Sequence, residues 1–247
     1  MMKRPAILIG IMLILLSAFP IFLIAREIVT QKQLDSRYEI SHSYINSYGS
    51  PSTIDTQEVE VLNQFIEIEE ISTGKIAPQT IHDLDEGVAG GDIVQIQWRV
   101  NGEEVSTADE IWLSNRDRGS RYHSWIDVLK VKDLQKNSES VVLIQRLTAN
   151  DERMEDRVWK LIQIDESGEV SEERFTYQNR HEHLLGVRLI NYSGTTLMST
   201  GYYSDLLHYY PSIYYPILYP FGTVIIGVLL VIFGVIYHYF RKRRVTV

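Results

Sequence analysis

The sequence places two histidines, His181 and His183, on either side of Glu182. On a β-strand, residues i and i+2 point to the same face, so both imidazoles could bind one Zn²⁺ or Cu²⁺ ion. A mononuclear site needs at least one further ligand, and the other histidines have no matching spacing. His181 and His183 are therefore candidate metal ligands, and the alternative is a solvated polar patch at the start of a strand.

The acidic run 83–87 resembles the opening of a calcium-binding loop. An EF-hand loop needs an oxygen ligand at its fifth position, glycine at its sixth and glutamate at its twelfth, and this run fails at all three. An irregular cation site built from Asp83, Asp85 and Asp92 is one interpretation. An acidic surface loop before a strand is the other.

Signatures of covalent catalysis are missing from the sequence. It contains no G-x-S-x-G motif and no Ser or Thr set beside an obvious His partner. It also contains no cysteine, which excludes a disulfide framework, thiolate metal sites and a cysteine nucleophile. Gly90 and Gly91 stand alone and form no Gly-rich phosphate loop. We therefore predict no catalytic residue, no cofactor and no enzymatic activity.

Charge is distributed unevenly along the chain, which carries a formal net charge of −8. Six of the 24 basic residues lie near the two ends with no acid beside them, and the remaining 18 face 32 acids, so the middle carries −14. The six are Lys3, Arg4, Arg241, Lys242, Arg243 and Arg244. A middle this acidic repels nucleic acid and has no basic stripe, which excludes a nucleic-acid partner.

Two apolar runs are long enough to cross a bilayer. Pro5 to Ala25 is 21 residues without a charge, about 31 Å of helix against a hydrocarbon core of about 30 Å. It exceeds the apolar core of a cleaved signal peptide, so we expect an uncleaved anchor. Pro20 should kink this helix or free a carbonyl near residue 16. Ile217 to Ile236 is 20 residues, with regular helix expected from about Phe221.

The positions of the basic residues predict the topology. Because Lys and Arg accumulate on the cytoplasmic side of a membrane, both termini should be cytoplasmic and residues of about 27–212 extracytoplasmic. The chain is then a two-pass protein of the cell membrane, with the lipid bilayer as its first partner.

Aromatic and small residues define the surroundings of the second run. Tyrosines gather at both of its ends, as in the aromatic belts of membrane helices, and the basic cluster follows. The predicted membrane-interface residues are Tyr209, Tyr210, Tyr214, Tyr215, Tyr219, Tyr237, Tyr239, Arg241, Lys242, Arg243 and Arg244. Thr223, Gly227 and Gly234 form a stripe of small residues that would allow close helix packing, although glycine is also simply common in such helices.

The segment between the runs has the two-residue period of β-strands. Val94, Ile96 and Trp98 alternate with polar residues, and Asn101-Gly102 then predicts a type I′ hairpin turn. Short apolar runs at spacings of about 10–15 residues favour one antiparallel β-sandwich or open barrel. The further predicted strands are Glu110–Leu113, Trp125–Val131, Ser140–Leu147, Val158–Ile164, Glu172–Tyr177 and Leu184–Asn191.

Two surface features of this domain have alternative interpretations. The tryptophans Trp98, Trp112, Trp125 and Trp159 all fall on predicted strands, where they would pack in the core or, if exposed, stack on carbohydrate. Asn191-Tyr192-Ser193 has the pattern of an N-glycosylation acceptor.

The fold class predicted from these patterns is a membrane protein with two transmembrane α-helices flanking one mainly-β extracytoplasmic domain. Helical periodicity in 25–48 predicts that the first helix continues outward as a stalk. The expected order is a first transmembrane helix (1–25), a helical stalk and loop (26–57), the β domain (58–205), an aromatic collar with the second transmembrane helix (206–240) and a basic cytoplasmic tail (241–247).

Two functions are compatible with this organisation. The first is a non-catalytic accessory or interaction protein whose β-rich domain binds a membrane-protein partner or a second copy of the chain. The second is a surface hydrolase or metal-dependent enzyme that uses the region of His181 and His183.

Overall fold

The computed structural model describes residues 3–46, 48–78, 90–113, 121–122, 124–148, 153–196, 199–207 and 216–245. The chain divides into two compact units. A helical unit combines Met1–Thr30 with Gly201–Val247, and a β domain comprises Gln31–Thr200.

The helical unit contains the two predicted apolar helices, which are confirmed. Helix α1 spans Lys3–Arg37 and α5 spans Thr223–Val245, and both are long and apolar enough to cross a membrane. A π-type turn, Ile217–Gly222, precedes α5, and within it Tyr219 has extended backbone angles (φ −141°, ψ 126°). Regular helix therefore begins two residues later than the sequence predicts.

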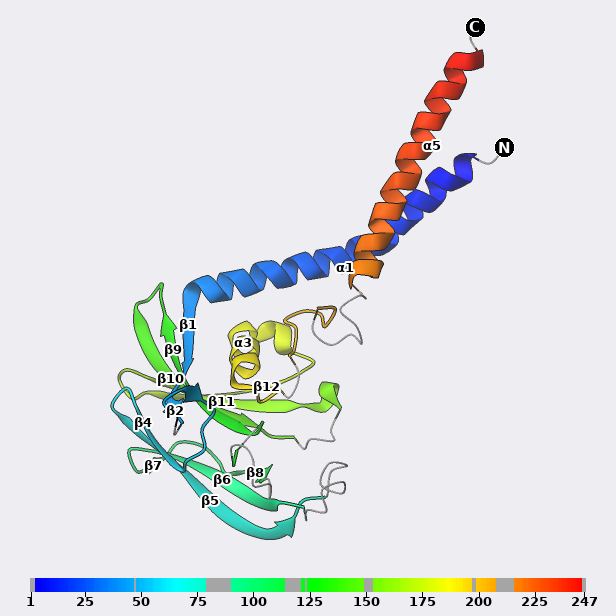
Figure 1. Ribbon diagram of the computed structural model, residues 1–247. Coiled ribbons are helices and arrows are strands. Elements are labelled where there is room, and N and C mark those ends of the chain that lie inside the picture. The colour runs from blue at the N-terminus through cyan, green and yellow to red at the C-terminus, as the bar shows by residue number, and fades with distance from the viewer. Residues whose placement is uncertain are drawn as a thin grey trace. The chain divides into compact units, whose positions relative to one another are not determined.

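The β domain is built from antiparallel strands, as predicted. One sheet has the order β1-β9-β10-β11-β12, and a second has the order β4-β5-β6-β7 with β8 also paired to β6 (Figure 1). The strands are β1 (Tyr38–His42), β2 (Tyr44–Ile45), β3 (Pro51–Ser52), β4 (Glu58–Val61), β5 (Gln64–Ile76), β6 (Asp92–Val100), β7 (Glu103–Glu104), β8 (Asp109–Trp112), β9 (Ile126–Asp133), β10 (Ser138–Arg146), β11 (Val158–Asp165) and β12 (Val170–Thr176).

The two sheets share one hydrophobic core. Ile66 of β5 and Trp98 of β6 meet Val128 of β9, Leu143 of β10 and Ile162 of β11, and all five side chains are buried. Residues of both antiparallel sheets therefore contribute to one core.

The central strands of the first sheet, β9, β10 and β11, are buried on both faces, which explains their sequence. Helix α3 (Leu184–Ser193) lies on the face of this sheet opposite the second sheet (Figure 1). On β10, Leu143 faces the shared core, whereas Val142 lines a small hollow together with Leu185 and Leu189 of α3. A strand covered on both faces needs a continuous apolar run, while β5, with one face open, alternates apolar and polar residues.

The predicted Asn101-Gly102 hairpin turn is confirmed. Both residues have positive φ angles, 52° and 83°, and Val100 pairs directly with Glu103 across the turn. A type I′ turn requires positive φ at both central positions, which Asn and Gly tolerate better than other residues.

The prediction of a strand at Leu184–Asn191 is wrong, because the segment forms α3. Its buried residues, Gly186, Val187, Leu189, Ile190 and Ser193, recur at spacings of one, three, four and seven residues, which is a helical stripe. Gly186 lets α3 approach the sheet, since an added Cβ there would lie 2.8 Å from the ring of Phe175.

The stalk helix is confirmed only as far as Arg37. Tyr38, which the helical pattern included, begins β1, and Ile45 lies in β2. Arg37 donates two hydrogen bonds to Asp133 at the end of β9 (3.1 and 2.8 Å), and its carbonyl accepts the Leu134 N–H. The helix therefore ends where its last residue is bound by the edge of the sheet.

Candidate functional site: the helix pair and its polar contacts

The small-residue stripe of Thr223, Gly227 and Gly234 on α5 faces α1. A Cβ added to Gly227 would lie 2.8 Å from the carbonyl oxygen of Gly10, and one added to Gly10 would lie 2.6 Å from the carbonyl oxygen of Gly227. A Cβ on Gly234 would lie 2.5 Å from Ile7. The stripe allows the close packing that the sequence predicts, and the neighbouring helix is the chain's own α1.

A tyrosine hydroxyl compensates for the proline in α1. In a helix the carbonyl of residue i−4 accepts the N–H of residue i, so Pro20, which has no N–H, leaves the carbonyl of Leu16 without its usual donor. The hydroxyl of Tyr219 donates to that carbonyl at 3.1 Å. This carbonyl is the one that the sequence predicts to be freed. Tyr219, predicted only as an interface residue, therefore also joins the two helices.

A second polar contact lies one residue further along α1. The hydroxyls of Ser17 and Thr223 are 2.6 Å apart, and Thr223 Oγ1 donates to the carbonyl of Pro220 at 2.8 Å. Ser17 is therefore the donor to Thr223, and its side chain is fully buried. Such a hydrogen bond between apolar helices fixes their register as well as their separation.

The third contact is a buried carboxylate that we call the Glu27 clasp, formed by Glu27, Tyr202 and Tyr203. Glu27 is 1 % exposed. Its Oε1 accepts the main-chain N–H of Tyr202 and its Oε2 that of Tyr203 at 3.0 Å. The Arg26 guanidinium stacks over the ring of Tyr203 at 3.7 Å, and a Cβ on Gly201 would lie 2.9 Å from Glu27 Oε1. Arg26 and Glu27, the charged residues directly after the first apolar run, therefore bind the segment around Tyr202 and Tyr203 that leads towards the second apolar run.

The remaining interface residues are described only in part. Tyr237 and Tyr239 lie on α5 with more than half of each side chain exposed. Tyr209, Tyr210, Tyr214 and Tyr215 lie outside the described residues. The helix continues through Arg241, Lys242, Arg243 and Arg244, whose side chains are also outside the description.

The two candidate metal ligands do not lie on a strand, so this part of the prediction is wrong. His181 belongs to a 3₁₀ turn, η2 (Arg180–Glu182), and His183 directly precedes α3. With three residues per turn, positions i and i+2 point about 120° apart, and the shared face is lost. His183 Nδ1 contacts Glu173, and its ring stacks on Phe175, whereas His181 is exposed. Among the described residues, no three metal-binding side chains gather.

The other predicted surface sites have mixed outcomes. Of the suggested cation ligands, Asp83 and Asp85 lie outside the described residues, and Asp92 is an exposed residue at the start of β6. The amide of Asn191 donates to the Thr200 carbonyl (2.7 Å) and accepts its N–H (2.8 Å). The folded chain thus uses the glycosylation-acceptor nitrogen within the β domain.

The tryptophans follow the core-packing interpretation. Trp98, Trp125 and Trp159 are buried, and Trp112 is half-buried with its ring 6.2 Å from that of Trp125. Trp98, Trp125 and Trp159 therefore present no open face for stacking on carbohydrate.

A buried lysine that the sequence does not reveal joins the two sheets. Lys160 of β11 donates to Asp109 Oδ2 (2.7 Å), the Thr107 carbonyl (2.9 Å) and Ser106 Oγ (3.3 Å). An ammonium has three N–H donors, and each has an acceptor here. Burial lowers the pKa of Lys160, and the hydrogen bond with Asp109 opposes this shift. Arg174 also contacts Asp109 at 3.0 Å.

The lysine belongs to a polar row that crosses the first sheet. Gln145, Lys160 and Arg174 are direct neighbours on β10, β11 and β12. Gln145 accepts the Trp98 indole N–H at 2.9 Å and donates to the Asp109 carbonyl at 3.2 Å. We call Gln145, Lys160, Arg174 and Asp109 the inter-sheet seam.

Two further carboxylates anchor loops to the sheets. Asp127 is fully buried, and burial raises the pKa of its carboxyl group. Its Oδ2 lies 2.9 Å from Nδ1 of His42, and its Oδ1 accepts the main-chain N–H groups of Ile54 and Val128. Glu70 accepts a bidentate pair from Arg121 (2.7 and 2.6 Å) and the Tyr122 hydroxyl, and the hydrogen bond from Arg121 lowers the pKa of Glu70.

Sequence reasoning missed these groups because isolated Asp, Glu and Lys residues have no local pattern that marks burial. Their partners lie between 51 and 85 residues away, except where a main-chain N–H is adjacent. No protein-family model, curated protein or solved structure matches the chain.

Proposed function

We propose that this chain is a two-pass, non-catalytic accessory protein of the cell membrane that presents its β domain on the extracytoplasmic side to bind a membrane-protein partner. The helix pair would anchor the chain, and the β domain would supply the binding surface. Each half of the proposal has its own support.

The observation that carries the membrane assignment is the contrast between the inner and outer faces of the helix pair. The facing side holds the glycines, Ser17 and Thr223, whereas the outward side exposes large apolar residues along both helices. Among them are Leu8, Met12, Leu15, Phe19, Phe22, Ile225, Leu229, Phe233 and Ile236. A soluble surface does not carry a continuous apolar area of this length, while a lipid environment requires it.

The charge distribution supports the proposed orientation. The basic residues at both ends belong on the cytoplasmic side, and the acidic middle, with its charge of −14, belongs outside. Within the β domain, the chemically active side chains that the structure brings together hold strands and loops in place. The Lys160 ammonium and the Glu70 carboxylate, for example, are both bound by several groups of the fold. This use of polar groups supports a binding role rather than catalysis.

Cysteine labelling tests the topology cleanly because the chain has no cysteine of its own. Lys136→Cys places a thiol on the exposed β9–β10 turn, and Thr246→Cys places one in the basic tail. A membrane-impermeant maleimide should label the first variant in intact cells and the second only after permeabilisation. Labelling of the tail in intact cells would contradict the proposal.

The partner half of the proposal needs a separate measurement. The full-length chain, solubilised in mild detergent, should copurify with a second membrane protein in constant ratio. Repeated recovery of the chain alone as a monomer would contradict the proposed accessory function but would not bear on the proposed topology.

A further inference from the structure

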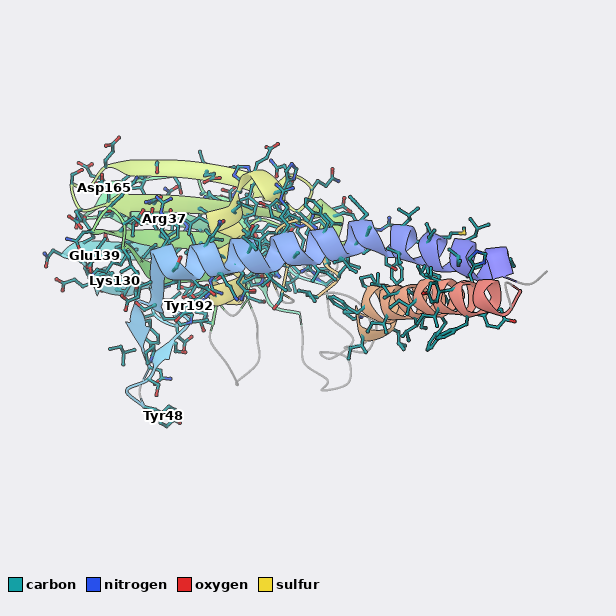
Figure 2. All side chains as sticks on the ribbon, turned by 90° about the horizontal axis from the view of Figure 1, so that it is seen from above. Arg37, Tyr48, Lys130, Glu139, Asp165 and Tyr192 are labelled. Carbon is teal, nitrogen blue, oxygen red and sulfur yellow. The ribbon has the colours of Figure 1, made fainter. Side chains whose placement is uncertain are left out.

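A short hairpin of the β domain exposes an aromatic side chain on a fixed backbone. Strands β2 and β3 pair with each other as a separate two-stranded sheet, and Figure 2 shows Tyr48 at the end of the projection that they form. Tyr48 is 91 % exposed and Ile45 is 64 % exposed. We call residues 44–46 and 48–52 the Tyr48 hairpin. Its tip presents two large side chains to solvent that contribute little to the core of the domain.

Both legs of the hairpin are anchored in the β domain. On one leg, Tyr44 packs against the shared core, and the preceding Ser43 donates its N–H to the Val128 carbonyl at 3.0 Å. After the other leg, Ile54 is fully buried, and its N–H reaches Asp127 at 3.3 Å. The hairpin is therefore held at its base by core packing on both sides.

The tip is held by one asparagine. The side-chain oxygen of Asn46 accepts the N–H groups of Tyr48 (3.0 Å) and Ser50 (3.1 Å). The Asn46 main chain adds two bonds, with Ser50 (3.0 Å) and Gly49 (2.9 Å), and Gly49 adopts the positive φ of 77° that closes the turn. Because these hydrogen bonds hold the described residues of the tip, contact with another molecule would cost little further conformational entropy there.

The composition of the hairpin indicates what kind of surface it fits. Residues 43–54 contain no charged side chain, in a chain of which 23 % is charged, and consist largely of Ser, Tyr, Asn and Gly. Tyrosine supplies a large contact area with only two rotatable angles, and such residues dominate protein-binding loops. The matching surface is an uncharged apolar pocket with a hydrogen-bond acceptor for the tyrosine hydroxyl.

Charge decides between the possible occupants. A lipid headgroup surface is bound by basic residues around an apolar tip, and this hairpin has none. A second copy of the chain would bring two acidic middles, each of charge −14, against one another. A different protein avoids both penalties.

We propose that the Tyr48 hairpin docks, through Tyr48 and Ile45, into an uncharged apolar pocket of a second, different protein. This inference rests on the proposed accessory function and names the surface that performs it. Tyr48 would fill the pocket, and Ile45 would cover its edge.

Site-specific photocrosslinking in the full-length chain tests the inference. p-Benzoylphenylalanine replaces Tyr48 in one variant and Phe65, an exposed aromatic residue of β5, in the matched control. On irradiation of intact membranes, position 48 should give one discrete adduct with another polypeptide, at a yield at least tenfold above position 65. Mass spectrometry should place the attachment in an apolar, uncharged peptide. Adding Ile45→Lys should lower the yield at least tenfold without changing the thermal unfolding of the domain.

Each other outcome is informative. An adduct with a second copy of the chain, an adduct with lipid, or equal yields at positions 48 and 65 overturns the inference. An adduct at 65 with none at 48 also overturns it, and leaves the accessory function standing. If neither position reacts and the chain also purifies alone from mild detergent, both the inference and the accessory function are wrong.

Discussion

Two buried charges, one in each unit, are stabilised in different ways. Glu27 in the helical unit is 1 % exposed, and its carboxylate accepts main-chain N–H groups from Tyr202 and Tyr203. Lys160 in the β domain is fully buried and donates to a carboxylate, a carbonyl and a hydroxyl. The first is a single carboxylate bound by backbone, and the second is one member of a polar row that crosses a sheet.

The difference extends to the units as a whole. In the helical unit the helices meet through glycines, and Ser17 and Tyr219 add hydrogen bonds between them. In the β domain, charged side chains such as Asp109 connect several strands at once. We therefore expect the helical unit to respond mainly to changes in side-chain volume and the β domain to changes in charge.

The largest effect is expected for Gly227→Leu. The new side chain would have to occupy space that the backbone of Gly10 fills, because even a Cβ would lie 2.8 Å from its carbonyl oxygen. In a Ser17→Cys/Thr223→Cys background, oxidation should crosslink the parent helices efficiently, since the native hydroxyls are 2.6 Å apart. Gly227→Leu should lower this crosslinking at least tenfold. Val228→Leu, on the exposed side of α5, is the control and should leave it unchanged.

The next largest effect is expected for Asp109→Ala. It leaves the buried Lys160 ammonium without its carboxylate, which costs about 3 kcal/mol or more when an ion pair is broken on one side. Glu110→Ala removes the neighbouring acid, whose partner Lys75 is exposed, and should cost less than about 1 kcal/mol. Thermal unfolding of the full chain in detergent measures both. Equal losses in the two variants would show that the seam adds nothing beyond a surface ion pair.

A smaller, pH-dependent effect is expected at Glu70. The pKa of Glu70 is lowered by the hydrogen bond from Arg121, so the folded state binds this proton less readily than the unfolded chain. The resulting stability is present above the ordinary glutamate pKa and is lost as the pH falls through the lowered value. Because Arg121 is 48 % exposed, solvent screening limits the size of the effect.

Unfolding curves between about pH 6 and pH 3 measure this contribution. Glu70→Gln should flatten the acid side of the stability profile, and Glu60→Gln, which leaves the Arg121 pair intact, should not. A profile of Glu70→Gln that parallels the parent protein would exclude the assignment.

The smallest effect is expected for Tyr219→Phe. The ring and its volume remain, and the hydrogen bond to the Leu16 carbonyl is lost, which is worth about 0.6–1.7 kcal/mol between membrane helices. The temperature at which cysteine crosslinking between the helices declines should fall slightly. Tyr239→Phe, at the far end of α5, is the control. A loss as large as that of Gly227→Leu would show that polar contacts, and not volume, dominate this unit.

The sequence predicts the helical unit better than the β domain because its signals are local. Two uninterrupted apolar runs define both helices, and Pro20 alone indicates the carbonyl that Tyr219 binds. Hairpins are also predictable where the turn residues are specific, as at Asn101-Gly102. None of this depends on distant parts of the chain.

The errors occur where distant residues decide. The apolar run at Leu184 is as compatible with a fully buried strand as with a helix, and packing against the sheet selects the helix. The prediction that His181 and His183 share one face was wrong for the same reason, because it assumed that these residues lie on a strand. The inter-sheet seam and the Glu27 clasp could not be predicted, because each requires contacts between residues more than 50 positions apart in the sequence.

The contacts of the helix pair also have a consequence for the order of synthesis. Tyr219 lies 203 residues after the Leu16 carbonyl, Thr223 lies 206 after Ser17, and Tyr202 lies 175 after Glu27. At a translation rate of about 5–20 residues per second, the first helix waits roughly 10–40 s for these partners. During that interval the ribosome-bound chain has an open helix carbonyl, an unpaired hydroxyl and a carboxylate that lacks its two N–H donors. Under the proposed membrane location, these polar groups of the nascent first helix would need shielding until the last fifth of the protein is made.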